Sequence, residues 1–169
     1  MVSTAAVGVP LLRDCGAQPL AERWLPKVAA GDAILAVGSA VNAFVSDAHV
    51  AHLLLLPHGD ELHAVEPDGA KRTRQRASDP SRRLFSVEWT PSKATRVAAG
   101  VAGRALLDAA LDRGALACAA QQLGVAQQLV DMAVAYACQR EQFGKPIIEQ
   151  PLLKTMLAKM AVNIEAVRA

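Results

Sequence analysis

The stretch Tyr136–Ile148, YACQREQFGKPII, decides the architecture of the second half of the chain because it joins two helical patterns. A long pattern ends at its arginine, Arg140, and a second pattern follows over Gln150–Ala169. Arginine presents a planar fork of donors that matches a phosphate or carboxylate. A corner between helices would hold this fork in place, which predicts an anion site suited to a phosphate-bearing cofactor. A purely structural alternative stays open, in which Arg140 only balances the dipole at the helix C-terminus.

The upstream pattern predicts a helix from about Gly103 to Gln139, and the spacing of its apolar residues predicts one buried stripe. The stripe consists of Leu107, Leu111, Cys118, Val125, Leu129, Met132 and Tyr136. An unbroken helix of this length would extend about 55 Å at the usual rise of ~1.5 Å per residue. Such a helix must pack against other long helices.

The downstream pattern predicts a helix that starts at Pro151, a residue favoured at the first helical position. Its predicted apolar face consists of Leu153, Met156, Leu157, Met160 and Ile164. Because the chain stops with this helix, we expect at least one apolar helical face to lack a cover.

The region between about Ala33 and Val97 predicts a small antiparallel sheet. Its apolar or alternating runs are Ile34–Val37, Val50–Leu56, Glu61–Val65 and Leu84–Trp89. His58-Gly59-Asp60 reads as a hairpin connection. The basic run Lys71–Arg76 is interpreted as a solvated loop.

A short amphipathic helix is expected before this region, over Ala17–Trp24, stopped by Pro26 and by a turn at Gly31-Asp32. The predicted fold class is α+β: a small antiparallel β-domain followed by long antiparallel helices that form an incomplete bundle. The predicted domains are 1–32, 33–98 and 99–169.

Composition narrows the function classes. Of 169 residues, 52% are hydrophobic and 20% charged, which suits a folded core. The net charge of +2 does not favour nucleic acid as a partner. The sequence shows no signal peptide and no apolar run long enough to span a membrane, and its three cysteines form no CxxC pair, so reduced thiols and a cytoplasmic location are expected. Four histidines between His49 and His63 lack the partners of a metal motif, and no metal site is predicted.

The segment Gln122–Ala169 resembles the C-terminal helical domain of the acyl-CoA dehydrogenases, which are FAD enzymes. The matching residues are Gly124-Val125-Ala126, Tyr136-Ala137, Arg140, Phe143-Gly144, Pro146-Ile147, Gln150, Leu157-Ala158-Lys159-Met160, Glu165 and Arg168. Weaker similarity extends upstream, where Val45–Leu56 resembles the strand that enters the family's β-domain. Trp24-Leu25-Pro26 with Gly31-Asp32 resembles the end of the N-terminal helical domain.

The resemblance implies which residues contact FAD and which partners the chain has. In the family this corner reaches across a subunit interface, so the resemblance implies a homo- or hetero-oligomer formed through the C-terminal helices. Arg140 would bind the FAD pyrophosphate, and the other implied contacts are Gln142, Phe143, Ile147, Gln150, Leu153, Phe44 and Ser46. The implied reaction is α,β-dehydrogenation of an acyl-CoA in fatty acid or lipid metabolism, with an electron-transfer acceptor.

Departures from the family pattern limit the expected activity. The family's Thr-Glu-Pro-x-x-Gly-Ser-Asp loop is absent, and only Ala36–Ala40 (AVGSA) lies nearby. The catalytic glutamate usually comes from a later segment, and its alternative early position falls on Gly114, with Ala115 where an arginine is usual. No catalytic residue is therefore assigned, and we expect a shortened member or a fragment. Two alternatives stay open: a non-catalytic partner subunit of a heteromeric dehydrogenase, and a structural helical protein that no longer binds flavin.

Overall fold

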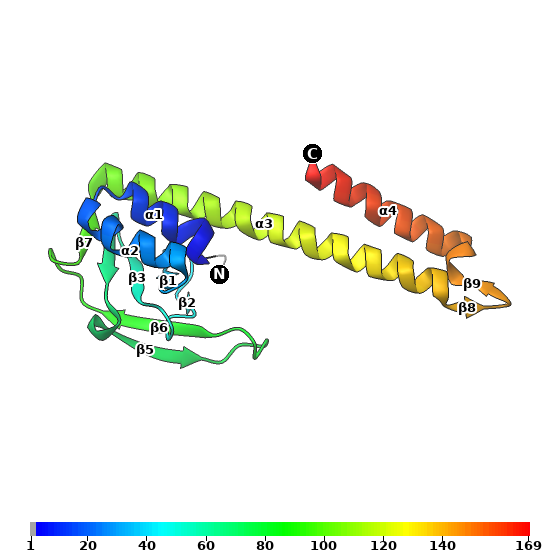
Figure 1. Cartoon of the computed structure of the whole chain (residues 1–169), viewed down its shortest axis with the longest axis horizontal. Coiled ribbons are helices and arrows are strands. Elements are labelled where there is room, and N and C mark those ends of the chain that lie inside the picture. Colours follow the sequence, from blue (N-terminus) through cyan, green and yellow to red (C-terminus); the bar gives the residue numbers. More distant parts are fainter. Residues whose placement is uncertain (1–2) are drawn as a thin grey trace. The chain divides into compact units, whose positions relative to one another are not determined.

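The computed structural model describes residues 3–169, which form two compact units (Figure 1). Unit 1 extends to Ala115, and unit 2 is Leu116–Ala169. The 40-residue helix α3 (Gly100–Gln139) contributes to both units and confirms the predicted long helix. Each unit is described by itself below.

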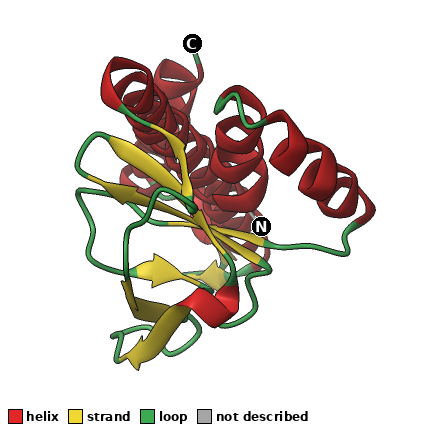
Figure 2. Cartoon of the chain, turned by 90° about the vertical axis from the view of Figure 1, so that its left-hand side faces the viewer, coloured by secondary structure: helices red, strands yellow, loops and turns green. Residues whose placement is uncertain are grey.

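Unit 1 has three layers, with helices on one face of a first sheet and a second sheet on its other face (Figure 2). The helical layer contains η1 (Ser3–Gly8), α1 (Val9–Asp14), α2 (Gln18–Ala30) and the start of α3. The first sheet has the order β1-β3-β4-β7, with bounds Leu35–Val37, Leu53–His58, Glu61–Val65 and Arg96–Ala98. The second sheet has the order β2-β6-β5, with bounds Val45–Ser46, Leu84–Trp89 and Ala70–Gln75, and the turn η2 (Pro67–Gly69) precedes β5.

Strand β3 lies at the centre of unit 1, and its run of leucines is buried on both faces. Leu53 and Leu55 pack with the helices, whereas Leu54 and Leu56 pack with the second sheet. Successive side chains of a strand point to opposite faces, so a strand covered on both sides needs a continuous apolar run. Burying each leucine contributes about 1.5–3 kcal/mol before the entropy of folding is counted.

The predicted β-region is confirmed in its main strands. Runs Glu61–Val65 and Leu84–Trp89 form β4 and β6 at the predicted bounds, whereas β3 begins three residues later than predicted, at Leu53. The predicted hairpin joins β3 to β4, and Gly59 has φ +61° in its two-residue turn. All strand pairs are antiparallel except β1 with β3, which is parallel.

The solvated-loop interpretation of Lys71–Arg76 is wrong, because residues Ala70–Gln75 form strand β5. The strand pairs with β6 over six residues and has no neighbour on its other side. An edge strand tolerates many charged residues, since basic side chains there keep the free edge from pairing with other chains. Charge along this run therefore indicated an edge rather than a loop.

Pro26 does not stop the first predicted helix, because α2 continues through it to Ala30. A proline inside a helix removes one backbone hydrogen bond, which here leaves only the carbonyl of Glu22 without its usual donor. The helix ends at Gly31, whose φ of +85° suits a glycine cap, and Asp32 N–H donates to Lys27 O at 2.8 Å.

Unit 2 is an antiparallel helix pair joined by a short hairpin. Strands β8 (Glu141–Gln142) and β9 (Lys145–Pro146) follow α3, and η3 (Ile147–Glu149) leads into α4 (Pro151–Arg168), which starts at Pro151 as predicted. Leu157 and Ile164 of α4 are buried, and Arg168 of α4 donates to Gln127 of α3 at 2.8 Å.

The predicted buried stripe of α3 is wrong for its part in unit 2. The stripe's members there lie exposed: Cys118, Val125, Leu129, Met132 and Tyr136. The less exposed positions follow a second helical stripe instead: Leu123, Ala126, Val130, Val134 and Ala137. Alanine and valine make up most of this second stripe, and their short side chains let a neighbouring helix approach closely. The larger side chains of the first stripe were given too much weight in the sequence pattern.

Candidate functional site

The corner between α3 and α4 is built on the two-residue hairpin of β8 and β9. Gln142 pairs with Lys145, and the two residues between them, Phe143 and Gly144, have φ of 55° and 76°. Two consecutive positive φ values are the pattern of a type I′ turn, which glycine adopts without strain. Phenylalanine in this conformation costs on the order of 1–2 kcal/mol, and its side chain is 92% exposed. The hairpin therefore holds a strained aromatic side chain out into solvent.

Arg140 lies at the base of this hairpin, directly after α3. Its N–H donates to Tyr136 O at 2.9 Å, and its carbonyl accepts from Ile147 N–H at 2.8 Å, which fixes the two ends of the hairpin together. Within residues 3–169 the exposed guanidinium takes part in no hydrogen bond or ion pair. The backbone is held while the charged end of the side chain is open to a ligand.

The start of α4 follows the hairpin through η3, whose first residue, Ile147, donates its N–H to the Arg140 carbonyl. Gln150 is the N-cap residue, but its side chain caps no backbone N–H. The first-turn donors of a helix have no partner within the helix, so the N–H groups of Leu152 and Leu153 lack an internal acceptor. Ile147, Gln150 and Leu153 are half-buried at this end of the helix.

The net charge of the corner is balanced. Glu141 and Glu149 supply two carboxylates, and Lys145 lies 3.9 Å from Glu149. Arg140 is the second cation. Anion binding here would rest on the directed donors of Arg140 and the helix start, since the summed charge attracts neither sign.

Six of the eight sequence-predicted contacts therefore come together in unit 2, and the other two lie in unit 1. Phe44 precedes strand β2, with its side chain 40% exposed and its N–H donating to Asn42 Oδ1 at 2.9 Å. Ser46 lies on β2 and pairs with Leu84. The structure brings Phe44 and Ser46 next to each other at one end of the second sheet.

The segment Ala36–Ala40 leaves strand β1 through a tight turn. A Cβ at Gly38 would lie 3.0 Å from the Leu56 side chain, and Ser39 forms a bridge with Asn42. Gly114 and Ala115, where the family's alternative base and its arginine would lie, are on α3 and carry no titratable group.

The sequence reading missed a buried polar chain in unit 1. His63 is 1% exposed, with Nδ1 2.9 Å from Thr95 Oγ1 and Nε2 3.0 Å from Glu61 Oε2. Arg96 donates to Glu61 at 2.6 Å, and this hydrogen bond, assisted by that from His63, holds the pKa of Glu61 below its ordinary value. The ionised carboxylate of Glu61 accepts from His63 Nε2–H, while His63 Nδ1 shares a hydrogen bond with the Thr95 hydroxyl, which also donates to Ser92 O at 3.1 Å. The sequence signal was the pair Glu61 and His63 at alternate positions of β4, which place both side chains on one face of the strand.

Two classes of site find no counterpart in the described part of the chain. Residues 3–169 contain no group of three histidine, cysteine or acidic side chains arranged to hold a metal ion. None of the described helices is long and apolar enough to cross a membrane.

Comparison with known proteins matches residues 102–169 to the C-terminal domain of acyl-CoA dehydrogenases. The acyl-CoA dehydrogenase IpdE2 of Mycobacterium tuberculosis is 31% identical over 141 residues, which cover 80% of this chain and 41% of IpdE2. The fold matches butyryl-CoA dehydrogenase from Megasphaera elsdenii with a TM-score of 0.85 and 20% identity, covering 99% of this chain and 55% of that one. It also matches a glutaryl-CoA dehydrogenase from Mycobacterium smegmatis in complex with FADH2, with a TM-score of 0.80 and 17% identity, covering 96% of this chain and 51% of that one.

The structural matches cover nearly the whole chain. The chain itself spans less than half the length of IpdE2. The shared fold confirms the α+β class, and the sequence matches confirm the resemblance carried by the Arg140 corner. The family's members are oxidoreductases, and their cofactor is FAD. Residues 102–169 of the chain belong to the C-terminal domain family of the acyl-CoA dehydrogenases, and the chain shares the fold of these enzymes over nearly its whole described length.

Proposed function

We propose that this chain supplies part of an FAD site at a subunit interface of an acyl-CoA dehydrogenase-like flavoprotein, without supplying the catalytic base. The observation that carries the proposal is the open guanidinium of Arg140 on a fixed backbone. A preordered cationic fork beside a helix start suits a pyrophosphate, because both the charge and the N–H groups favour anionic oxygens.

The residues at the corner fit the shape and chemistry of such a cofactor. The N–H groups of Leu152 and Leu153 lack an internal acceptor. Phe143 offers an aromatic face that is 92% exposed, and Ile147 offers half-buried apolar surface. When bound, FAD accepts the hydride from the β-carbon of the acyl group. In this proposal Arg140 holds the pyrophosphate, Gln142 and Phe143 lie beside it, and Ile147, Gln150 and Leu153 line the adenosine end.

Phe44 and Ser46 are proposed to contact the flavin from the β-domain. An exposed aromatic ring and a hydroxyl group at the end of the second sheet could cover the ring and donate a hydrogen bond to it. The proposal assigns them no role in proton transfer.

The absence of a base from this chain is part of the proposal. Gly114 and Ala115 cannot take a proton, and Glu141, Glu149 and Glu165 are exposed side chains on the hairpin, the following turn and α4. Abstraction of the α-proton of an acyl-CoA would then depend on a carboxylate supplied from outside the residues described.

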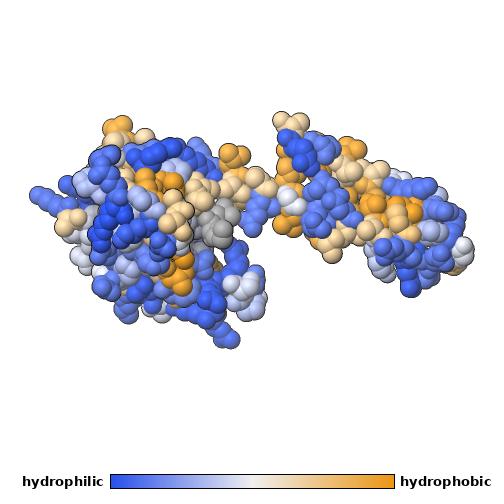
Figure 3. All heavy atoms as spheres, viewed as in Figure 1, coloured by the Kyte–Doolittle hydropathy of each residue, from blue (hydrophilic) through white to orange (hydrophobic). Residues whose placement is uncertain are grey.

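A partner subunit is proposed because unit 2 exposes much apolar surface (Figure 3). Leu129, Met132 and Tyr136 of α3 are each about 60% exposed, and Leu152 and Val162 of α4 are 75% and 67% exposed. Covering such surface yields about 25 cal/mol per Å². A homo- or hetero-oligomer through these helices, with an acyl-CoA substrate and an electron-transfer acceptor for the reduced flavin, completes the proposed function.

Flavin absorbance of the purified chain tests the first part of the proposal. Yellow protein that keeps its colour on gel filtration supports a working half-site. Colourless protein that binds no added FAD, alone or with a co-expressed family subunit, contradicts it and leaves the structural-protein alternative.

Co-expression separates the remaining alternative. Colour that appears only with a second, unlike family subunit would favour the non-catalytic partner of a heteromer. Turnover of acyl-CoA by the isolated chain would contradict the absence of a base.

A further inference from the structure

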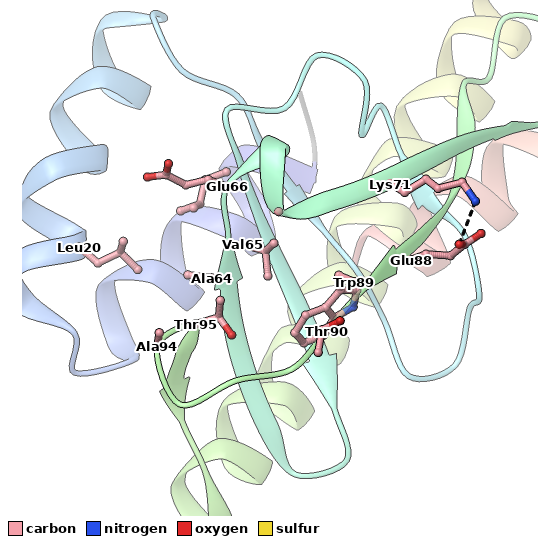
Figure 4. A pocket seen from close by; sticks show the side chains of 12 residues that line it. Leu20, Ala64, Val65, Glu66, Lys71, Glu88, Trp89, Thr90, Ala94 and Thr95 are labelled. Carbon is pink, nitrogen blue, oxygen red and sulfur yellow. Dashed lines mark hydrogen bonds and ion pairs between the residues drawn. The ribbon is translucent and has the colours of Figure 1, made fainter.

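Unit 1 contains a cleft of about 810 Å³ at the end of the two sheets where β4 and β6 finish (Figure 4). Its lining comes from α2, from β3 to β6 and from the connection before β7: Leu20, Leu53, Ala64, Val65, Glu66, Gly69, Lys71, Glu88, Trp89, Thr90, Ala94 and Thr95. Small-molecule sites in proteins usually measure about 300–1,000 Å³, so this cleft has room for a ligand.

Three of the residues that line the cleft have little or no side chain. Ala64, Gly69 and Ala94 all line it. The layers of a sandwich normally interdigitate larger side chains across about 10 Å. None of these three residues lies between the sheets, and their small size leaves room at this end of the unit.

The cleft is lined by apolar side chains and by a hydroxyl group, that of Thr90, which is free to bind a ligand. Leu20 and Trp89 lie on opposite sides of the cleft in Figure 4. Apolar lining that is at most 2% exposed comes from Leu53, on the helical face of β3, and from Val65, on the face toward the second sheet. The Thr95 hydroxyl is engaged by His63 and Ser92, whereas that of Thr90 has no partner within residues 3–169. An aromatic wall favours a flat ring system, and the Thr90 hydroxyl can bond one polar group on it.

The charges around the cleft argue against an anionic ligand. Glu66 pairs with Arg23 at 2.8 Å, and Lys71 pairs with Glu88 at 3.1 Å. The lining itself carries two carboxylates and one ammonium group. Arg23 balances Glu66, and the ammonium group of the lining is already paired with Glu88, so an anionic ligand would find no free cation among the lining residues, whereas a neutral ligand needs none.

The cleft is separate from the proposed flavin contacts of unit 1. Ser46 pairs with Leu84 at the start of β6, and Trp89 is at the strand's other end. Five steps along a strand cover about 17 Å at ~3.3 Å per residue. A ligand in the cleft therefore would not occupy the position proposed for the flavin beside Ser46.

We propose that this cleft binds a flat, uncharged small molecule that carries a hydroxyl group, with its ring against Trp89 and its hydroxyl on Thr90. Binding at this site does not depend on FAD, so a negative result here leaves the proposed function untouched.

The test uses the indole N–H signals of the full chain in a nitrogen–proton correlation spectrum. The chain has two tryptophans, of which Trp24 is 7% exposed in the core of unit 1, and Trp89→Phe assigns the second signal. The probes are 2-naphthol and naphthalene-2-sulfonate, which share a ring system but differ in charge. The Trp89 signal should move saturably with 2-naphthol, about tenfold more weakly with the sulfonate, and the Trp24 signal should stay in place.

Variants at the rim sharpen the test. Ala94→Phe, at an exposed lining position, should fill the cleft and abolish the shift, whereas Lys93→Phe, one residue outside the lining, should leave it unchanged. Thr90→Val should weaken 2-naphthol binding severalfold. A Trp89 signal that does not move, that responds equally to both probes, or that still moves in Ala94→Phe would overturn the proposal.

Discussion

Unit 1 and unit 2 handle their apolar residues in opposite ways. Unit 1 covers both faces of β3, and the four leucines of that strand are at most 3% exposed. Helix α3 in unit 2 turns a stripe of mostly alanine and valine toward α4 and leaves its larger apolar side chains in solvent. The apolar side chains of β3 in unit 1 are covered by the unit's own layers. In unit 2, α4 covers one stripe of α3, and the larger apolar side chains of α3 remain exposed. The difference supports the proposal that unit 2, rather than unit 1, meets a partner subunit.

Truncating a leucine in each unit should give the largest contrast. Leu55→Ala should lower the free energy of unfolding by about 2–5 kcal/mol, because it leaves a cavity in the core of unit 1. Leu129→Ala, at a residue that is 60% exposed, should change it by about 0.5 kcal/mol or less. Urea denaturation at low protein concentration measures both. A large loss at Leu129 that grows with protein concentration would mean that a second copy already covers this face.

Two glycines of α3 should respond with opposite signs. A Cβ at Gly103 would clash with the carbonyl oxygen of Asp60 in the β3–β4 turn, so Gly103→Ala should destabilise the chain by about 1–3 kcal/mol. A Cβ at Gly124 meets nothing within 4 Å, so Gly124→Ala should stabilise α3 by about 0.5–1 kcal/mol. Thermal unfolding followed by circular dichroism compares them. If both variants changed the melting temperature by the same amount, Gly103 of α3 would not lie against the β3–β4 turn.

The buried polar chain of unit 1 should make that unit sensitive to acid. The pKa of Glu61 is held below its ordinary value, chiefly by the hydrogen bond from Arg96. Its contribution to stability is therefore present above the unfolded pKa of 4.5 and is lost as the pH falls through the lower folded pKa.

The variant Arg96→Met tests this dependence without adding bulk. It should bring the pKa of Glu61 nearer to its ordinary value and flatten the fall in melting temperature below about pH 4.5. Arg104→Met, which removes an exposed pair with Asp108, is the matched control and should leave the slope unchanged. Identical slopes for wild type and Arg96→Met would contradict the assignment.

The smallest effect is expected at the tip of the hairpin in unit 2. Phe143→Asn creates an Asn-Gly turn, the pair that type I′ turns prefer, and should raise stability by about 0.5–1 kcal/mol. The same variant should weaken FAD retention if the exposed ring contacts the cofactor. Calorimetry measures the first effect and flavin absorbance the second. A gain in stability without any change in retention would show that the strained phenylalanine has no part in the site.

The sequence predicted the elements with strong periodicity or clear turn chemistry. The hairpin at Gly59, the helix start at Pro151 and the long helix before Arg140 all followed from local rules. Strand β5 was missed because its position at an edge depends on β6, and its charges are opposite to the apolar pattern expected of a strand. Strands β2 and β7 have two and three residues, too few for any periodicity.

Side-chain environments were harder to predict than elements. The predicted buried stripe of α3 was chosen because its apolar side chains are large. Which stripe is buried depends on the neighbouring helix, and α4 covers the stripe with the shorter side chains. The corner residues were found through Arg140 and the motif around it. The chain of Glu61, His63 and Thr95 joins β4 to the turn before β7, with His63 lying 32 residues before Thr95, and no local sequence pattern predicts such a contact.

The most direct test of the central claim is the amount of FAD retained per chain after gel filtration, compared between wild type and Arg140→Ala. Each protein is measured alone and with a co-expressed family subunit. Arg140 makes no contact that folding needs beyond its backbone, so both proteins should unfold at the same temperature. Wild type should retain flavin in at least one of the two settings, and Arg140→Ala should retain severalfold less. Equal retention by the two proteins, or none by the wild type in either setting, would contradict it.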